Sequence, residues 1–169
     1  MEPLFSVILP VFNSEKTVET DDENTENIIS YVTGINCYAA TAIDEMIAVK
    51  NHFGIEELLS KYDVSQDIKE CLCKLPELFG SAQMLQEAKK MPLNKRSLKA
   101  LERLEAVYEA VKVYGEEDYI TFDLGIVSKY NYYTGIIFRA YTFGSGEPIV
   151  KGGRYDKLLS HFGRKLPAV

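Results

Sequence analysis

The sequence predicts an α+β fold: a helical N-terminal half, then an antiparallel sheet with a helix at the C-terminal end. Two observations predict it. Between residues 36 and 115, apolar residues recur every three or four positions, as on one face of an amphipathic helix. From residue 119 onward the period falls to two and glycines separate the apolar segments, which is typical of short strands joined by turns.

The helical half divides into five amphipathic segments. The first covers residues 36–50, and Phe53-Gly54 is expected to end it before three shorter helices, one of them capped by Ser65. The longest is expected over about residues 95–114, with Gly115 as its stop. Its apolar stripe is more typical of a core face than of a binding groove, and consists of Leu98, Leu101, Leu104, Val107, Tyr108 and Val111.

The C-terminal third is expected to form three strands, at residues 120–124, at residues 136–141 and from residue 148, joined as an antiparallel meander. A helix is expected from Arg154 to about Phe162. Because Arg154 would then lie in the first helical turn after a Gly-Gly pair, a small anion or carboxylate is expected to fit there.

Composition excludes several classes of protein. A net charge of −6 and a pI near 5.0 argue against non-specific binding to nucleic acid or anionic membranes, although a local basic pocket stays compatible. The apolar run at residues 4–9 is too short to span a membrane and lacks the basic region of a signal peptide.

No metal site is expected. An odd number of cysteines without a secretory signal fits reduced thiols of a cytosolic protein, either buried or half-exposed. Cys71 and Cys73 are two positions apart on a predicted helix and point in different directions, so they cannot share an ion. His52 and His161 have no Cys or His neighbour at metal-ligand spacing.

The N-terminal segment differs from the rest of the chain. Residues 4–9 form a continuous apolar run, which predicts a buried strand of the parallel type, and the acidic residues 15–26 predict a solvated linker. Residues 5–13 resemble the opening strand and loop of family 2 glycosyltransferases, in which a later Asp-Asp pair helps bind the nucleotide-sugar and its metal. Asp21-Asp22 resembles that pair, although the helix and strand between are missing.

Three motifs in the C-terminal third carry a more specific resemblance. Phe122-Asp123-Leu124-Gly125 is followed by the block at residues 132–138 and then by Gly152-Gly153-Arg154-Tyr155-Asp156. Together they resemble the histidine-recognising half of the histidyl-tRNA synthetase catalytic domain. They are more closely similar to its paralogue, the regulatory subunit of ATP phosphoribosyltransferase. The resemblance covers about residues 50–169 and implies a partial class II aminoacyl-tRNA synthetase-like fold.

Two positions distinguish the paralogues. The synthetases carry an arginine where this chain has Ser128, and that arginine stabilises the charge that develops as the adenylate forms. They carry an acidic residue where this chain has Asn131, whose neutral amide offers no full charge to an amino group. Both departures imply a non-catalytic regulatory subunit with no catalytic residue. A histidyl-tRNA synthetase-like fragment is the alternative, and a glycosyltransferase-derived chain is the second.

The resemblance implies a histidine-like pocket. Sheet-core packing is the alternative role for its aromatic residues. The resemblance also implies a partner, the catalytic subunit of ATP phosphoribosyltransferase. The two would form a cytoplasmic hetero-oligomer that supports the first step of histidine biosynthesis. Histidine is the expected ligand, and no cofactor, membrane or nucleic acid is expected. The pocket residues are Tyr132, Tyr133, Thr134, Gly135, Gly152, Gly153, Arg154 and Tyr155.

Three regions are expected. Residues 1–35 form an N-terminal strand and acidic linker, residues 36–115 a helical insertion-like region, and residues 116–169 a synthetase-like antiparallel sheet fragment. The family's dimerisation motif, first ATP-binding motif and last strand-helix have no counterpart, so the resemblance implies an internal piece of the regulatory subunit. Because an incomplete sheet exposes edges and apolar surface, self-association is expected, and independent function is not.

Overall fold

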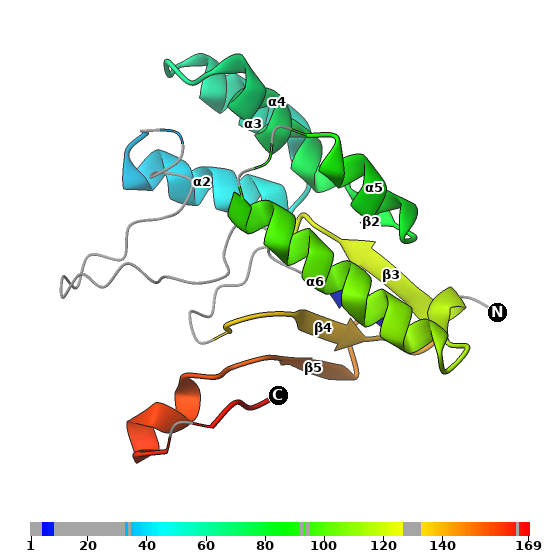
Figure 1. Ribbon diagram of the computed structural model, residues 1–169. Coiled ribbons are helices and arrows are strands. Elements are labelled where there is room, and N and C mark those ends of the chain that lie inside the picture. The colour runs from blue at the N-terminus through cyan, green and yellow to red at the C-terminus, as the bar shows by residue number, and fades with distance from the viewer. Residues whose placement is uncertain are drawn as a thin grey trace.

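The computed structural model describes residues 5–8, 33, 35–91, 93, 95–126, 133–164 and 166–169. Figure 1 shows most of the helices above a sheet, with the longest helix lying along it. The helices are α2 (Cys37–Ala48), α3 (His52–Ser60), α4 (Gln66–Lys74), α5 (Gln83–Lys89) and α6 (Lys95–Lys112). Short 3-10 segments are η1 (Leu75–Glu77), η2 (Glu117–Tyr119) and η3 (Leu158–Phe162).

The sheet has the order β2-β3-β1-β4-β5. Its strands are β1 (Phe5–Ile8), β2 (Phe79–Gly80), β3 (Ile120–Asp123), β4 (Ile137–Ala140) and β5 (Val150–Gly153). The pairs β2–β3, β1–β4 and β4–β5 are antiparallel, and β1 runs parallel to β3. The predicted α+β fold is confirmed. A strand forms near the N-terminus as predicted, but it is parallel only to β3 and antiparallel to β4.

The predicted three-strand meander is wrong in one respect. Strands β3 and β4 do not pair with each other, because β1 lies between them and pairs with both. Strand β2 was not predicted. Its two residues at the β3 edge follow Pro76, which had indicated only a boundary between helices.

One apolar core joins the helices to the sheet. Leu101 and Leu104 of α6 are fully buried, as the stripe predicted, whereas Leu98 is 37% exposed at the margin. On the same helix, the Tyr108 ring packs against Phe122 of β3 in a T-shaped arrangement, with ring centroids 5.6 Å apart. Helices α2, α3 and α5 contribute fully buried side chains to this core, namely Ile43, Ile47, Ile55, Leu59 and Leu85.

The break between α2 and α3 lies earlier than predicted. Lys50 has a left-handed backbone (φ 57°), which ends the first helix. The side chain of Asn51 then accepts a hydrogen bond from the Gly54 amide at 3.0 Å and caps the next helix. Phe53-Gly54 is therefore the first turn of α3 and not a breaker, because this cap fixes the local conformation.

An ion pair ties this junction to the sheet. Lys50 Nζ lies 3.3 Å from Oδ2 of Asp123, whose side chain is only 9% exposed. The same ammonium group lies 4.4 Å from the ring centroid of Phe79, the register partner of Asp123. The other oxygen, Oδ1, accepts the Gly125 amide at 3.0 Å. The buried carboxylate is thus both paired and hydrogen-bonded, as its burial requires.

The helix predicted from Arg154 to Phe162 is largely wrong. Helical structure begins only at η3, and the backbone at Arg154 continues the extended course of β5. Its amide donates to the Ile136 carbonyl at 2.9 Å, and its carbonyl accepts the Thr134 amide at 2.7 Å. These hydrogen bonds to the segment that precedes β4 hold Arg154 in an extended, sheet-like conformation, which is incompatible with a helix beginning there.

The thiols of α4 are buried or half-buried, as predicted. Burial raises the pKa of Cys71 to about 11. Burial, followed by the carboxylates of Glu56 and Glu77, also raises the pKa of Cys73. Both thiols are free and are protonated at neutral pH.

In the part of the chain that the structure describes, no helix is both long and apolar enough to cross a membrane.

Replacement of Leu101 tests whether the core is shared. Leu101→Ala should lower the free energy of unfolding by about 2–5 kcal/mol, because it leaves a cavity in the core to which α6 and β3 both contribute. Leu98→Ala, on the exposed margin of the same helix, should change it by less than about 1 kcal/mol. Chemical denaturation followed by circular dichroism measures both. Equal losses would contradict the packing described.

Candidate functional site

The two glycines at the end of β5 are required by space. A Cβ at Gly152 would lie 2.5 Å from Cζ of Phe138, its register partner on β4. A Cβ at Gly153 would lie 2.7 Å from Cδ1 of Tyr133 and 2.8 Å from the Ile136 carbonyl oxygen. Neither glycine has a left-handed backbone. Aromatic rings therefore occupy the places that side chains of β5 would otherwise fill.

These contacts lie on opposite faces of the sheet. Phe122 and Phe138 are both register partners of Val7, so Gly152 shares the face that α6 covers. Gly153 faces the other side, and so does the Tyr133 ring that packs on it.

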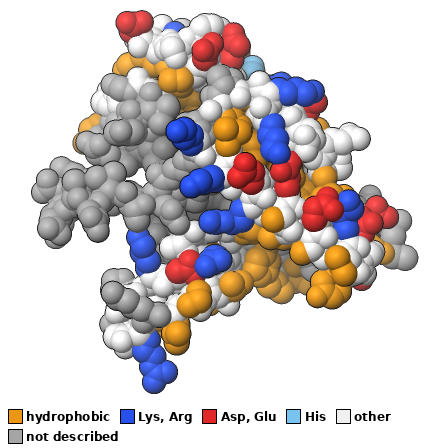
Figure 2. Space-filling model, in the orientation of Figure 1, with side chains coloured by type: hydrophobic (Ala, Val, Ile, Leu, Met, Phe, Trp, Pro, Cys, Tyr) orange, Lys and Arg blue, Asp and Glu red, His pale blue; other side chains and the backbone are white. Residues whose placement is uncertain are grey.

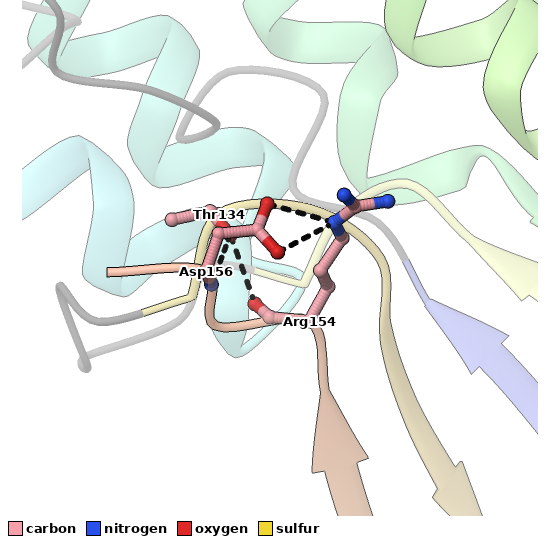
Figure 3. Close-up of polar contacts among 3 residues, drawn as sticks. All are labelled: Thr134, Arg154 and Asp156. Carbon is pink, nitrogen blue, oxygen red and sulfur yellow. Dashed lines mark hydrogen bonds and ion pairs between the residues drawn. The ribbon is translucent and has the colours of Figure 1, made fainter. Parts of the chain in front are cut away.

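A hydrogen-bonded corner joins the chain entering β4 to the chain leaving β5 (Figure 3). The Thr134 amide donates to the Arg154 carbonyl at 2.7 Å, and the Thr134 hydroxyl also lies 3.4 Å from that oxygen. The Asp156 amide in turn donates to Oγ1 of Thr134 at 3.0 Å. Thr134 is only 8% exposed, so its hydroxyl joins two segments that are distant in sequence.

Arg154 and Asp156 form an ion pair at this corner. Nε of Arg154 lies 2.8 and 3.0 Å from the two carboxylate oxygens. This hydrogen bond is the main reason that the pKa of Asp156 is lowered, and Thr134 and Arg103 lower it further. Since the pKa is lower in the folded chain, the stabilisation is present at neutral pH and is lost as the pH falls through that lowered pKa.

The predicted pocket residues form two groups. Thr134, Gly135 and Arg154 meet at the corner, where a Cβ at Gly135 would lie 3.1 Å from Cδ of Arg154. Tyr133 packs on Gly153 on the other face. Tyr155 is half-buried, and its amide donates to the Ala168 carbonyl at 2.9 Å. Ser128, Asn131 and Tyr132 lie outside the described residues.

Sequence reasoning missed two residues of the corner. Asp156 belongs to the quoted motif, and its position two residues after an arginine could have indicated the ion pair. Arg103 lies on the exposed side of α6, with Nη1 3.6 Å from the position of a Gly135 Cβ. Its exposure predicted only a solvated helix face, and no local signal places it over β4.

The chemistry of this corner favours recognition of charge. A carboxylate whose pKa is held low by an arginine is a poor general base at neutral pH, because proton transfer is most efficient near the working pH. Arginine side chains present planar donor groups that suit carboxylates and phosphates.

Comparison with known proteins supplies the family. The chain matches the family model described as histidyl-tRNA synthetase over residues 27–169. The ATP phosphoribosyltransferase regulatory subunit of Acetivibrio thermocellus is 40% identical over 136 residues, which cover 80% of this chain and 32% of that protein. The regulatory subunit of Ruminiclostridium cellulolyticum is 46% identical over 127 residues, covering 75% and 30%. The chain thus spans about a third of the length of these curated relatives.

Comparison with solved structures places the fold in the same family. An ATP phosphoribosyltransferase regulatory subunit/histidyl-tRNA synthetase from Bacillus halodurans matches 99% of this chain and 41% of its own, with a TM-score of 0.76 and 28% identity. A histidine–tRNA ligase subunit from Alicyclobacillus acidocaldarius shares the fold at a TM-score of 0.63 and 21% identity. The fold is therefore a partial class II aminoacyl-tRNA synthetase-like fold, as the motifs predicted. Within that class, the chain belongs to the histidyl-tRNA synthetase family.

Substitution of Gly153 tests the close packing at the corner. Gly153→Ala should cost about 1–3 kcal/mol of unfolding free energy, because the methyl group meets a backbone oxygen that cannot move aside. Gly146→Ala, in the loop before β5 with open space around it, should change stability by less than about 1 kcal/mol. Thermal unfolding of both variants measures this. A neutral Gly153→Ala would refute the packing.

Proposed function

We propose that this chain acts as a non-catalytic regulatory component of ATP phosphoribosyltransferase, the activity that begins histidine biosynthesis. The observation that carries the proposal is its 40–46% identity to regulatory subunits across three quarters or more of its length. Since the chain spans about a third of those relatives, the proposal concerns the helical region and sheet that these residues form.

The chemistry of the corner around Thr134 favours ligand binding and not catalysis. Arg154 is paired with Asp156, and this pairing lowers the pKa of the carboxyl group. Ser128 stands where the synthetases carry the arginine that stabilises the adenylate.

Histidine is the ligand that we propose for the sheet face away from α6. Tyr133 lies on this face against Gly153, and an imidazole can stack on a tyrosine ring or bond its hydroxyl. Tyr155 is two residues beyond Gly153 and half-buried, which fits a second wall of the same pocket. The Arg154 side chain lies with Arg103 near the opposite face and would contribute through the shape of the corner.

The proposed partner is the catalytic subunit of ATP phosphoribosyltransferase, in a cytoplasmic hetero-oligomer. The word "subunit" in the names of the relatives supports a partner.

Histidyl-tRNA synthetase activity is the second candidate. It is favoured by the name of the matching family and by the double name of the Bacillus halodurans structure. Histidine-dependent exchange of pyrophosphate into ATP separates the two candidates, because only adenylate chemistry produces it. We expect no exchange, and measurable exchange would establish the synthetase role instead.

Calorimetric titration with histidine tests the regulatory proposal. Histidine should bind, and Tyr133→Phe should weaken binding about two- to tenfold through the loss of one hydroxyl contact. Tyr114→Phe is the matched control, because Tyr114 is 80% exposed beyond α6 and should bind as the unmodified chain does. Absence of histidine binding, or equal weakening in both variants, would contradict the proposed pocket.

A further inference from the structure

Two arginine side chains from distant parts of the sequence converge on one point. Nη1 of Arg103 lies 3.6 Å, and Cδ of Arg154 3.1 Å, from the position that a Cβ at Gly135 would occupy. Glycine at this position leaves room for both. The Arg154 side chain is 48% exposed and Arg103 is also exposed, so solvent reaches the site.

The positive charge there is only partly neutralised. Asp156 engages Nε of Arg154, and Figure 3 shows the two terminal nitrogens of that guanidinium directed away from the carboxylate. Within the described part of the chain, Arg103 has no ion pair. The α6 residues three and four positions on either side of it are Lys99, Ala100, Ala106 and Val107, none of which is acidic.

Lys99 extends the cluster along α6. It lies one turn before Arg103, about 6 Å away along the helix axis, and is exposed. Glu102 is three residues from Lys99, but no ion pair joins these two described side chains. The next carboxylate of the helix, Glu105, is held by Lys89 of α5 at 2.6 Å. Figure 2 shows basic side chains following one another down this face of the molecule.

This arrangement selects for a compact, multiply charged anion. Arg103 and Arg154 with Asp156 leave one positive charge in excess beside Gly135, and Lys99 adds a second one turn away along α6. A single carboxylate ligand would neutralise only part of this excess, whereas adjacent phosphate groups can accept from both guanidinium groups and from the ammonium group together. The net charge of −6 disfavours an extended polyanion such as nucleic acid.

We propose that Arg103, Arg154 and Lys99 form a binding site for a polyphosphate-bearing small molecule on the α6 side of the sheet. This site is separate from the histidine pocket proposed for the other face. Its ligand carries at least two linked phosphate groups, either as an inorganic polyphosphate or as the polyphosphate of a nucleotide.

Calorimetric titration of the full chain at low ionic strength tests the site, with sodium tripolyphosphate as probe. Tripolyphosphate should bind, and inorganic phosphate should bind at least about tenfold more weakly because it engages fewer cations. Arg103→Gln should weaken tripolyphosphate binding about tenfold. Arg164→Gln, an equal change in charge at an exposed arginine beyond η3, should leave the affinity unchanged.

Two results would overturn the proposal: no binding of tripolyphosphate at about millimolar concentration, or equal weakening by the two substitutions, which would show an effect of net charge alone. A nucleoside triphosphate in the same titration distinguishes the sources. Tighter binding than tripolyphosphate supports a nucleotide ligand, and equal or weaker binding supports an inorganic polyphosphate. Unchanged circular dichroism melting of the Arg103→Gln chain confirms that it folds.

Discussion

The packing of α6 on the sheet is the contact on which the rest of the structure depends. Leu101 and Leu104 are fully buried, and Tyr108 meets Phe122 edge-on, so one apolar core includes the helical region and β3. Since a helix presents different faces, the same packing that buries these leucines leaves Arg103 exposed beside Gly135. Stability and the placement of positive charge at the corner therefore have one cause.

The second constraint is the close approach of β4 and β5. Gly152 and Gly153 admit Phe138 on one face and Tyr133 on the other, and the Thr134–Arg154 hydrogen bond closes the end of the pair. The aromatic-Thr-Gly and Gly-Gly-Arg-Tyr-Asp motifs are thus complementary halves of one corner. The two surfaces proposed for binding, an aromatic one and a basic one, lie on opposite faces of the sheet at this corner.

Local pattern predicted the local structure well. The three-to-four-residue period gave the buried face of α6, and the period of two together with glycines gave β3 and β4. What failed depends on distant partners. Periodicity does not say which strand lies beside which, so the insertion of β1 between β3 and β4 was missed. Arg154 was expected in a helix because its backbone hydrogen bonds to Thr134 and Ile136 join segments distant in sequence. The residues next to Arg154 do not predict such bonds. Arg103 was missed for the same reason, since exposed arginines on helices are ordinary.

The proposed regulatory role fits the identity to regulatory subunits and the serine at position 128. Analytical ultracentrifugation tests it most directly, with this chain mixed with the catalytic subunit of ATP phosphoribosyltransferase from the same organism. The regulatory role predicts that both proteins sediment together in a species heavier than either alone. Separate sedimentation of the two proteins, with this chain shown to be folded by circular dichroism, would contradict it.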